Sequence, residues 1–535
     1  MPGSYVPGRG PLNARLCILG EAPGRQEEEQ KRPFVGASGK LQEGYMRQVG
    51  IDPTQVRYEN VYPFRPRGKG GSIHSVPQEE LARWQEDCCA RLDTMASVQI
   101  IVPVGNTALQ TLLGLSQISL RRGSMYQWKN VYGRDVKVIP TIHPAAILRD
   151  TTLEYRTIKD WERIARELTK GPEVVYPRRT FLLDPPAEHF WDWADGALRT
   201  ERGGVNPLAI DIETNPKEQK ILCVGFAGSS DLGVSLSWNR EHKGWIKELC
   251  GSSQPKMLQN GLYDLYWLKM FGVSVANYQY DTMAMSHCLR PNNSHSLAFL
   301  ASLYTDEPYY KGGDDEDDEK VWEGSDWYAL LEYNARDCMV TYEIGWEKLW
   351  PLLEAQGLTA RYQQHYRALF LPLLGLMTHG VQINQEIMEQ EYGRLSAAAR
   401  AAQRHAEALC GRRLSRVSGA GRQALLRRLE GESGSALEKA IARLRTPLDQ
   451  VERELSALGI SDQCLASLLY KDWKLPVQTH RKTGSVTVDE HALRTLLQKV
   501  EKRGDQTQAL CVQDVLAFRH LSKLKEFYHP ARLDE

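Results

Sequence analysis

The segment LAIDIETN occupies residues 208–215 and has the apolar pattern of a buried strand, interrupted by two acidic residues. Side chains alternate between the two faces of a strand, so Asp211 and Glu213 point to the same face. Two carboxylates at that spacing repel each other, and a positive charge is needed between them. LAIDIETN therefore predicts a β-strand that carries a charged site inside a folded domain.

Two acidic motifs follow this strand. MLQNGLYDLYWL places Asp264 after an Asn-Gly turn at the start of a helical pattern. LLEYNARDCMVTYEI places Tyr333 and Asp337 four residues apart, on one face of a helix. Two divalent cations roughly 4 Å apart would cancel the repulsion, activate a water and stabilise the leaving oxygen of a phosphodiester. We expect Mg²⁺ or Mn²⁺ on Asp211, Glu213, Asp264 and Asp337, with Tyr333 orienting the attacking water.

The motifs DIET, NGLYD and YNARD, in that order, resemble the tyrosine-containing subclass of the DEDD proofreading 3′–5′ exonucleases. The resemblance covers roughly residues 205–350 and implies an RNase H-like fold, with the four carboxylates and the phenol as catalytic residues. It also implies that Thr214 meets the terminal nucleotide and that Asn260 contacts the entering single strand. Asp281 precedes a helical run, and we expect it to cap that helix and not to bind metal.

The N-terminal block alternates the short apolar strands LCILG, VQIIVPVG and VKVIPTI with helical stretches, which is typical of an α/β sandwich. Glu21, Phe34, Asn60 and His143 follow or lie near strand ends, so we expect them to converge at one sheet edge. A stacking aromatic, an amide and a histidine suit a pocket for an extruded base. Cleavage of a glycosidic bond would need His143 to stabilise a leaving pyrimidine anion and Glu21 to polarise water.

In this block GEAPG, the acidic run after it, RPFVG, N-x-x-x-x-RP and HPAAILR resemble family 4 of the uracil-DNA glycosylase superfamily, over about residues 16–150. The fold that this resemblance implies is an α/β/α sandwich. The implied roles are water polarisation for Glu21, a place in the neighbouring acidic run for Glu27, uracil stacking for Phe34, base recognition for Asn60, contact with uracil O2 for His143, and a DNA-groove contact for Arg149.

The cysteines depart from that family. Its members hold an iron–sulfur cluster on four cysteines, including a C-x-x-C before the GEAPG turn, whereas MPGSYVPGRGPL contains no cysteine and Cys88 and Cys89 are adjacent. We therefore expect no cluster. Two interpretations stay open for this block: a working glycosylase that excises uracil, or a domain that only senses uracil, contacts DNA or packs against its neighbour.

The third block is helical by composition, and from Arg400 to Arg428 it holds eight arginines against the single Glu407. Such a run contacts phosphates or forms a solvated helix face. RALFLPLLGLMTHGVQINQEIM resembles the palm entry of family A DNA polymerases, and ISDQCLASLLYKDWKLPV, RKTGSVTVDEHALRTL and VLAFRHLSKLKEFY resemble their thumb. A thumb grips duplex DNA through its backbone, which favours phosphate contacts. The residues expected to contact DNA are Arg412, Arg413, Arg416, Arg422 and Lys482.

The resemblances predict a multidomain α/β chain: a glycosylase-like domain at 1–175, an exonuclease domain at 176–355, and a palm-entry and mainly helical thumb region at 356–535. The polymerase motifs of family A do not occur before the last residues ARLDE. We therefore expect no polymerase activity from the chain alone. It is either a truncated chain or one subunit of a split polymerase, whose palm and fingers come from another polypeptide, a plan associated with phages.

Composition limits the function classes. The 67 basic and 67 acidic residues balance, so contact with DNA must come from local patches. The ten cysteines include no C-x-x-C pair, which favours reduced thiols, and the absence of an apolar run of about 18 residues argues against a membrane span. We expect a cytoplasmic protein, in the host cytoplasm if it is viral. Two functions are compatible with the sequence: a proofreading exonuclease with a uracil-recognising domain, or a non-catalytic accessory subunit that positions primer-template for a separate polymerase.

Overall fold

The computed structural model describes residues 3–67, 72–198, 206–311, 326–412, 414, 459–479 and 485–528. The chain divides into two compact units, Met1–Gly380 and Val381–Glu535. The first unit contains two β-sheets, and the second is mainly helical over its described residues. The domain boundaries predicted at residues 175 and 355 stay predictions.

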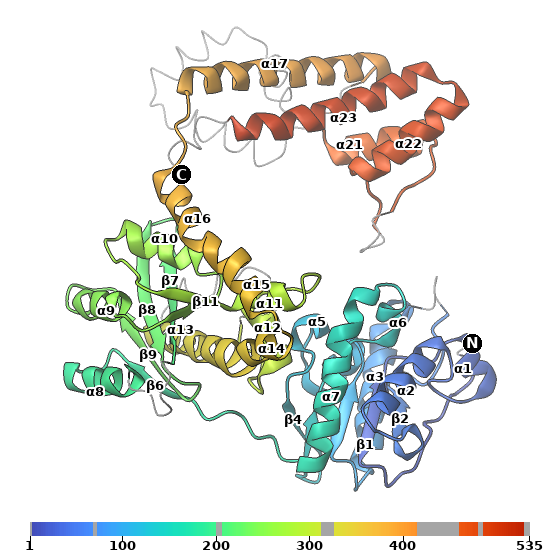
Figure 1. Ribbon diagram of the computed structural model, residues 1–535. Coiled ribbons are helices and arrows are strands. Elements are labelled where there is room, and N and C mark those ends of the chain that lie inside the picture. The colour runs from blue at the N-terminus through green and yellow to red at the C-terminus, as the bar shows by residue number, and fades with distance from the viewer. Residues whose placement is uncertain are drawn as a thin grey trace, which may run out of the picture. The chain divides into compact units, whose positions relative to one another are not determined.

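The first sheet has the strand order β2-β1-β3-β5-β4. Strands β2, β1, β3 and β5 are parallel, and the edge strand β4 is antiparallel to β5. We call this region, from β1 to α7, the N-terminal domain (Figure 1). Its elements are β1 (Leu16–Gly20), α1 (Arg25–Gln30), α2 (Ala37–Gln48), η1 (Pro53–Gln55), β2 (Arg57–Asn60), η3 (Ile73–Ser75), α3 (Gln78–Asp93), β3 (Ile100–Pro103), α4 (Asn106–Leu113), α5 (Ile118–Arg121), β4 (Tyr126–Lys129), β5 (Asp135–Val138), α6 (Pro144–Ile147), η4 (Thr151–Leu153) and α7 (Glu154–Lys170).

Strand β1 is buried on both faces, as its apolar run predicts. Leu16 and Ile18 pack with residues of α2, α6 and α7 on one face. Cys17 and Leu19 pack with residues of α3 and α4 on the other face. The N-terminal domain is therefore a three-layer α/β/α sandwich, and the carboxyl ends of its parallel strands lie at one edge.

The second sheet has the order β11-β10-β7-β8-β9-β6 and is mixed, because β8 pairs antiparallel with both β7 and β9. We call the region from β6 to α16 the central domain. Its elements are β6 (Thr180–Leu183), α8 (Ala187–Leu198), β7 (Leu208–Asn215), β8 (Lys220–Ala227), β9 (Leu232–Ser237), α9 (His242–Gly251), β10 (Lys256–Leu258), α10 (Leu262–Met270), β11 (Tyr278–Asp281), α11 (Thr282–Leu289), α12 (Leu297–Tyr304), α13 (Trp327–Tyr342), a π-helical turn (Glu343–Leu349), α14 (Trp350–Ala355), α15 (Thr359–Arg361), a second π-helical turn (Tyr362–Arg367) and α16 (Ala368–His379).

Strand β7 separates two packing environments. Ile210 and Ile212 belong to an apolar core shared with α8, α9, α10 and α16. Ala209 points the other way and packs with Cys338 and Met339 of α13. Because side chains alternate along a strand, Asp211 and Glu213 lie on the α13 face with Ala209. The alternation that fills the core thus also turns both carboxylates toward α13.

The second unit is built around two long helices. Helix α17 (Gln385–Cys410) lies beside α23 (Gln506–Phe527), as Figure 1 shows. Helices α21 (Asp462–Ala466) and α22 (Glu490–Arg503) and a π-helical turn (Ser467–Asp472) complete its core. None of the helices in the described parts of either unit is both long and apolar enough to cross a bilayer.

A buried ion pair ties α7 to the turn before β4. The side chains of Arg122 and Asp160 are 1% and 0% exposed, and they form an ion pair. Thr141 Oγ1 also donates to Asp160 Oδ2 over 2.7 Å, and Arg122 Nη1 donates to Ser302 Oγ of α12 over 2.8 Å. The arginine therefore fixes α7 within the N-terminal domain and at the same time contacts the central domain.

Asp160→Ala should lower the free energy of unfolding by about 3–5 kcal/mol, because it leaves the buried Arg122 guanidinium without its carboxylate. The adjacent Lys159 is partly exposed and pairs with the exposed Glu162. Lys159→Ala should therefore cost no more than about 1 kcal/mol. Urea denaturation followed by tryptophan fluorescence measures both, and equal losses in the two variants would contradict the structural role of the buried pair.

Candidate active sites

A cavity of about 410 Å³ opens at the carboxyl edge of the first sheet. Three of the four residues that the sequence predicted to converge at this edge, Phe34, Asn60 and His143, line the cavity, and so does Glu27 of the acidic run. Its other lining residues are Ala22, Gly24, Arg25, Gln26, Gly36, Ala37 and Ser38. Parallel strands deliver their following residues to the same edge, which is why segments far apart in sequence meet there.

Gly20 allows the side chains of Phe34 and Asn60 to approach the backbone at the end of β1. It ends β1 directly opposite Asn60 of β2. A Cβ at residue 20 would lie 2.5 Å from Asn60 Oδ1 and 2.6 Å from Phe34 Cζ, which is closer than non-bonded atoms approach. Phe34 itself has φ 57° and packs against Tyr58 with ring centroids 5.5 Å apart. The first glycine of LGEAPG is therefore needed for the close approach of the aromatic ring to the amide.

His143 is held in one tautomer. Its Nδ1 accepts a hydrogen bond from the backbone N–H of Ala145 over 3.1 Å, so the ring proton of the neutral form must be on Nε2. Burial lowers the pKa of His143 to about 4, and the positive charge of Arg149 adds to that shift. At neutral pH the residue is therefore an uncharged imidazole whose Nε2–H is a hydrogen-bond donor.

The remaining predicted residues of this region lie around the pocket and do not line it. Glu21 follows β1, and its Oε2 accepts a hydrogen bond from Thr107 Oγ1 over 2.6 Å. Arg149 is exposed just after α6. Within the pocket, Glu27 accepts a hydrogen bond from the backbone N–H of Gly24 and closes the first turn of α1. Thr107 was not anticipated from the sequence, because nothing in its local pattern marks it.

The cysteines do not fit an iron–sulfur cluster. Cys17 is buried within β1 and Cys88 within α3, while the Cys89 thiol contacts the carbonyl oxygen of Thr111. Over the described ranges, the side chains close enough to hold a metal together are carboxylates, and no cysteine is among them. Burial is also the main reason that the pKa of Cys88 is raised to about 12, which disfavours the thiolate that binds iron.

The second candidate site lies between β7 and α13. One carboxylate oxygen from each of Asp211, Glu213 and Asp337 lies within 4.8 Å of the other two. Tyr333 stands one helical turn before Asp337 on the same helix. The meeting follows from the two periodicities, since the strand turns alternate residues to one face and the helix presents residues four apart on one face. These hard oxygen donors fit a divalent cation such as Mg²⁺ or Mn²⁺.

Asp264 lies outside this close group but shares its electrostatics. It occupies the first turn of α10 and is 5% exposed. Its pKa is raised well above the ordinary value, first by burial and then by the charges of Asp211 and Glu213. Burial likewise raises the pKa of Asp211 to about 7, with the charge of Asp337 adding to it. A bound cation would relieve both penalties.

The residues predicted to guide the DNA strand flank the same site. Thr214 Oγ1 is 2.6 Å from the hydroxyl of Tyr263, and Asn260 has φ 56° in the turn before α10. Asp281 Oδ1 accepts a hydrogen bond from the N–H of Ala284 over 2.9 Å and begins α11, so its prediction as a helix cap is confirmed. Thr214 is half-buried near the end of β7 and Asn260 is exposed, and their predicted contacts with DNA stay predictions.

Three residues of the acidic site escaped the sequence analysis. Asn334 Nδ2 donates to Asp211 Oδ2 over 2.8 Å, and Tyr310 donates its hydroxyl to Asp337 Oδ1 over 2.5 Å. Lys311 donates to the Tyr333 oxygen over 2.6 Å and forms an ion pair with Asp337. Asn334 was visible within YNARD, but no local spacing marks Tyr310 and Lys311, because a loop brings them to the site.

The predicted DNA contacts of the second unit are only partly within the described residues. Arg412 forms an ion pair with Asp472 and donates from Nη2 to the carbonyl oxygen of Cys464 over 2.9 Å. Its guanidinium therefore has partners within its own unit. The other four, Arg413, Arg416, Arg422 and Lys482, lie outside the described residues, and all five assignments stay predictions.

Comparison with known proteins finds polymerase similarity over most of the chain. A DNA polymerase of Bacillus phage SP01 is 26% identical over 393 residues, which covers 65% of this chain and 41% of the phage protein. The chain thus spans about two fifths of that polymerase. The solved POL domain of Pol1 from M. smegmatis, in complex with DNA primer-template and dNTP, is 15% identical and covers 65% of this chain and 49% of its own, with a TM-score of 0.40.

The N-terminal domain gives the closer matches. Residues 7–168 match the family model of the uracil DNA glycosylase superfamily. A type-4 uracil-DNA glycosylase of Archaeoglobus fulgidus is 32% identical over 178 residues, which covers 32% of this chain and 86% of that protein. The type-4 enzyme of Thermotoga maritima is 34% identical over 157 residues, which covers 29% of this chain and 77% of that protein. Because residues 7–168 match the family model and the chain covers 86% of a relative that is 32% identical, the chain belongs through its N-terminal domain to the uracil DNA glycosylase superfamily.

Proposed function

We propose that this protein is a DNA repair and replication enzyme with a metal-dependent 3′–5′ exonuclease in its central domain and a uracil-recognising N-terminal domain. The observation that carries the exonuclease is the group formed by Asp211, Glu213 and Asp337, whose oxygens lie within 4.8 Å of one another, with Tyr333 one turn away on α13. The order of the acidic motifs and the similarity to a phage DNA polymerase support the same proposal.

The acidic group would bind two Mg²⁺ or Mn²⁺ ions, with Asp264 as the fourth ligand. When bound, such ions supply a hydroxide at neutral pH and stabilise the leaving oxygen of the phosphodiester. The side chains of this chain do the rest. Tyr333 orients the attacking water, Asn334 holds Asp211 in place over 2.8 Å, and Thr214 contacts the terminal nucleotide. The sheet around β7, in this proposal, is an RNase H-like core.

The N-terminal pocket would receive a uracil flipped out of DNA. Phe34 stacks on the base, and Asn60 reads its polar edge. As the bond between C1′ and N1 breaks, both bonding electrons leave with the uracil, and His143 Nε2–H donates to O2, where the negative charge gathers. Glu21, oriented by Thr107, polarises the water whose oxygen bonds to C1′ and accepts the proton that this water loses. A neutral His143 suits this task. A protonated histidine would be a buried charge in the free protein, and burial of a charge costs free energy.

We further propose that the chain works as a subunit of a family A DNA polymerase whose polymerising part is a separate polypeptide. The similarity to the DNA polymerase of Bacillus phage SP01 across 65% of this chain supports the association with a polymerase. The second unit would then act as the thumb and bind the DNA backbone. Loss of DNA binding and of its salt dependence after deletion of 381–535 tests this role, since phosphate contacts release counterions.

Asp337→Asn should slow digestion of a 5′-labelled primer in Mg²⁺ by about 100-fold or more, because it removes one charged ligand from the acidic group. EDTA should abolish digestion by the unmodified protein. Glu218→Gln, a charge removal at an exposed residue near the same sheet, is the control and should leave the rate unchanged. Persistence of wild-type digestion in Asp337→Asn would exclude this carboxylate group as the nuclease site.

Uracil excision should need no metal. With EDTA present, the unmodified protein should leave an alkali-labile site at a single uracil in DNA, and His143→Gln should lower the rate by about 100-fold because it moves the donor that stabilises the leaving anion. Gly20→Ala should also lower it, by forcing Phe34 and Asn60 apart. His189→Gln changes an exposed histidine and serves as control. Binding of uracil DNA without any cleavage would make the domain a sensor.

The protonation state of His143 predicts a pH dependence of stability. Its folded pKa of about 4 is below the ordinary value of 6.5, so between these values the unfolded chain binds the proton and the folded chain does not. Stability from this residue is complete above pH 6.5 and is lost as the pH falls toward 4, by at most about 3 kcal/mol. Urea denaturation at pH 7 and pH 4 should therefore show a smaller loss for His143→Asn than for the unmodified protein. Equal losses would contradict a neutral His143.

A further inference from the structure

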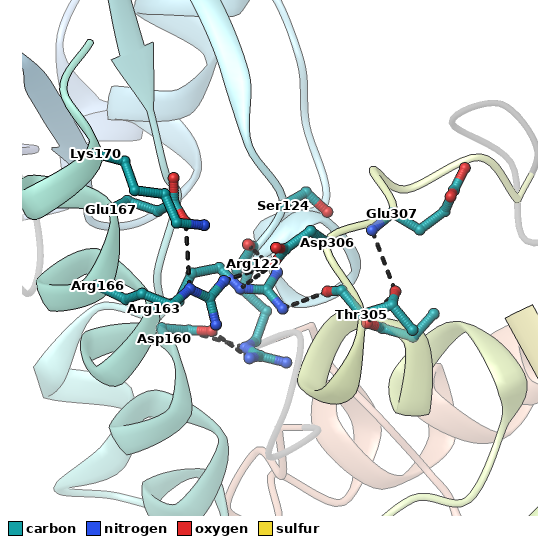
Figure 2. A network of polar contacts seen from close by, with 12 residues as sticks. Arg122, Ser124, Asp160, Arg163, Arg166, Glu167, Lys170, Thr305, Asp306 and Glu307 are labelled. Carbon is teal, nitrogen blue, oxygen red and sulfur yellow. Dashed lines mark hydrogen bonds and ion pairs between the residues drawn. The ribbon is translucent and has the colours of Figure 1, made fainter. Parts of the chain in front are cut away.

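Residues 305–311, which we call the strap, connect two parts of the molecule with different chemistry. The strap leaves the C-terminal end of α12 without forming a helix or a strand. Its first residues face α7 of the N-terminal domain, as Figure 2 shows. Its last two residues, Tyr310 and Lys311, contact the acidic site of the central domain. A single short segment therefore contacts both the N-terminal domain and the candidate nuclease site of the central domain.

The N-terminal domain holds the first half of the strap through buried groups. Arg163 of α7 is 5% exposed, and it donates to the backbone carbonyl oxygens of Thr305 and Gly123. Ser124, which is 2% exposed, accepts a hydrogen bond from the backbone N–H of Tyr309 over 3.2 Å. The bonds to the Thr305 carbonyl and from the Tyr309 N–H involve the main chain of the strap and fix its path. A surface ion pair would leave the main chain free to move.

Glu307 fixes the middle of the strap to the central domain. Its side chain is 1% exposed and lies between two arginines. Arg179, which precedes β6, donates to Glu307 Oε2 over 2.8 Å, and Arg336 of α13 donates to Oε1 over 2.7 Å. Arg336 is the residue immediately before Asp337. The strap is thereby aligned along α13 at the turn that carries the nuclease carboxylate.

The end of the strap contacts both functional groups of α13. Lys311 Nζ donates to the oxygen of Tyr333 over 2.6 Å and forms an ion pair with Asp337, while lying 4.5 Å from the centre of the Tyr333 ring. Tyr310 donates to the other carboxylate oxygen of Asp337 over 2.5 Å. An ammonium group can only donate, so the Tyr333 oxygen accepts this bond and its own hydroxyl hydrogen is directed elsewhere.

We propose that Lys311 is a positioning residue of the exonuclease site, which fixes the hydroxyl of Tyr333 relative to Asp337, and that the glycosylase-family domain keeps it there by holding the strap. This inference rests on the proposed nuclease. It gives the N-terminal domain a second role, as part of the support of the nuclease site, that does not depend on uracil.

The first test replaces the ammonium by a methyl thioether of similar length. Lys311→Met should lower the single-turnover rate of digestion by about 10- to 100-fold at saturating DNA, because Tyr333 loses its fixed orientation. Lys311→Arg, which keeps a charged donor, should recover part of the rate. Tyr333→Phe combined with Lys311→Met should lose little more than Tyr333→Phe alone, because both changes remove the same hydrogen bond.

Metal binding separates positioning from construction of the ligand set. Mn²⁺ titrated into the DNA-free protein and followed by electron paramagnetic resonance should bind Lys311→Met at least as tightly as the unmodified protein, since a repelling charge is gone. Loss of Mn²⁺ binding in Lys311→Met, or additive losses in the double variant, would overturn the positioning role. A fully active Lys311→Met would also overturn it while leaving the proposed nuclease intact, whereas an inactive unmodified protein would defeat the proposed nuclease itself.

The second test addresses the hold of the N-terminal domain. Arg163→Gln and the milder Ser124→Ala should each increase hydrogen–deuterium exchange of the 305–311 peptide and slow digestion. The variant with the larger increase in exchange should also show the larger loss of digestion rate. Lys159→Ala, on α7 but paired with Glu162, is the control and should change neither. Exchange that stays at the level of the unmodified protein in both Arg163→Gln and Ser124→Ala would overturn the anchoring, whatever the nuclease rate.

Discussion

The mutual repulsion of buried carboxylates is the constraint around which the central domain is organised. Asp211, Glu213 and Asp337 place oxygens within 4.8 Å of one another, and Asp264 lies close enough for their charges to raise its pKa. Such a group is unstable in a low-dielectric interior unless protons or cations offset it. Three hydrogen-bond donors of the chain stabilise these carboxylates: the amide of Asn334, the hydroxyl of Tyr310 and the ammonium of Lys311.

The pocket of the N-terminal domain rests on the opposite electrostatic condition. His143 is uncharged because burial lowers its pKa to about 4, and the N–H of Ala145 fixes which nitrogen keeps the proton. The neutral Nε2–H of His143 can donate to an anion that develops in the cavity, and no charged group has to be buried beforehand. The two candidate sites therefore differ in kind: one concentrates negative charge for cations, and the other offers a neutral donor to an anion that forms during the reaction.

Buried arginines link these two regions. Arg122 and Arg163 of the N-terminal domain are each 5% exposed or less and donate to residues of α12 or the strap. Arginine suits this position because its planar group serves several acceptors at once and stays charged when buried. The contacts unite the glycosylase-family domain and the central domain in one unit, which gives a physical route by which the first domain can support the second.

The features that depend on local periodicity and local backbone geometry could be predicted from the sequence. The apolar segment LCILG predicted a strand of an α/β sandwich, the i, i+2 spacing put Asp211 and Glu213 on one face of a strand, and the i, i+4 spacing put Tyr333 and Asp337 on one face of a helix. The GEAPG turn and the residues after each parallel strand predicted a pocket at one sheet edge, where Phe34, Asn60 and His143 do meet. These features follow from geometry that a few neighbouring residues fix.

The features that depend on long-range packing became visible with the tertiary structure. It placed Lys311 and Tyr310 against Asp337 through a strap whose sequence has no period, and it set Thr107 beside Glu21 from a different strand–helix connection. It also set the pKa values, because burial is a property of the whole fold and no spacing of residues reports it. Local sequence patterns identify the functional groups. The charges and hydrogen bonds that set their pKa values and orientations come from segments that only folding brings together.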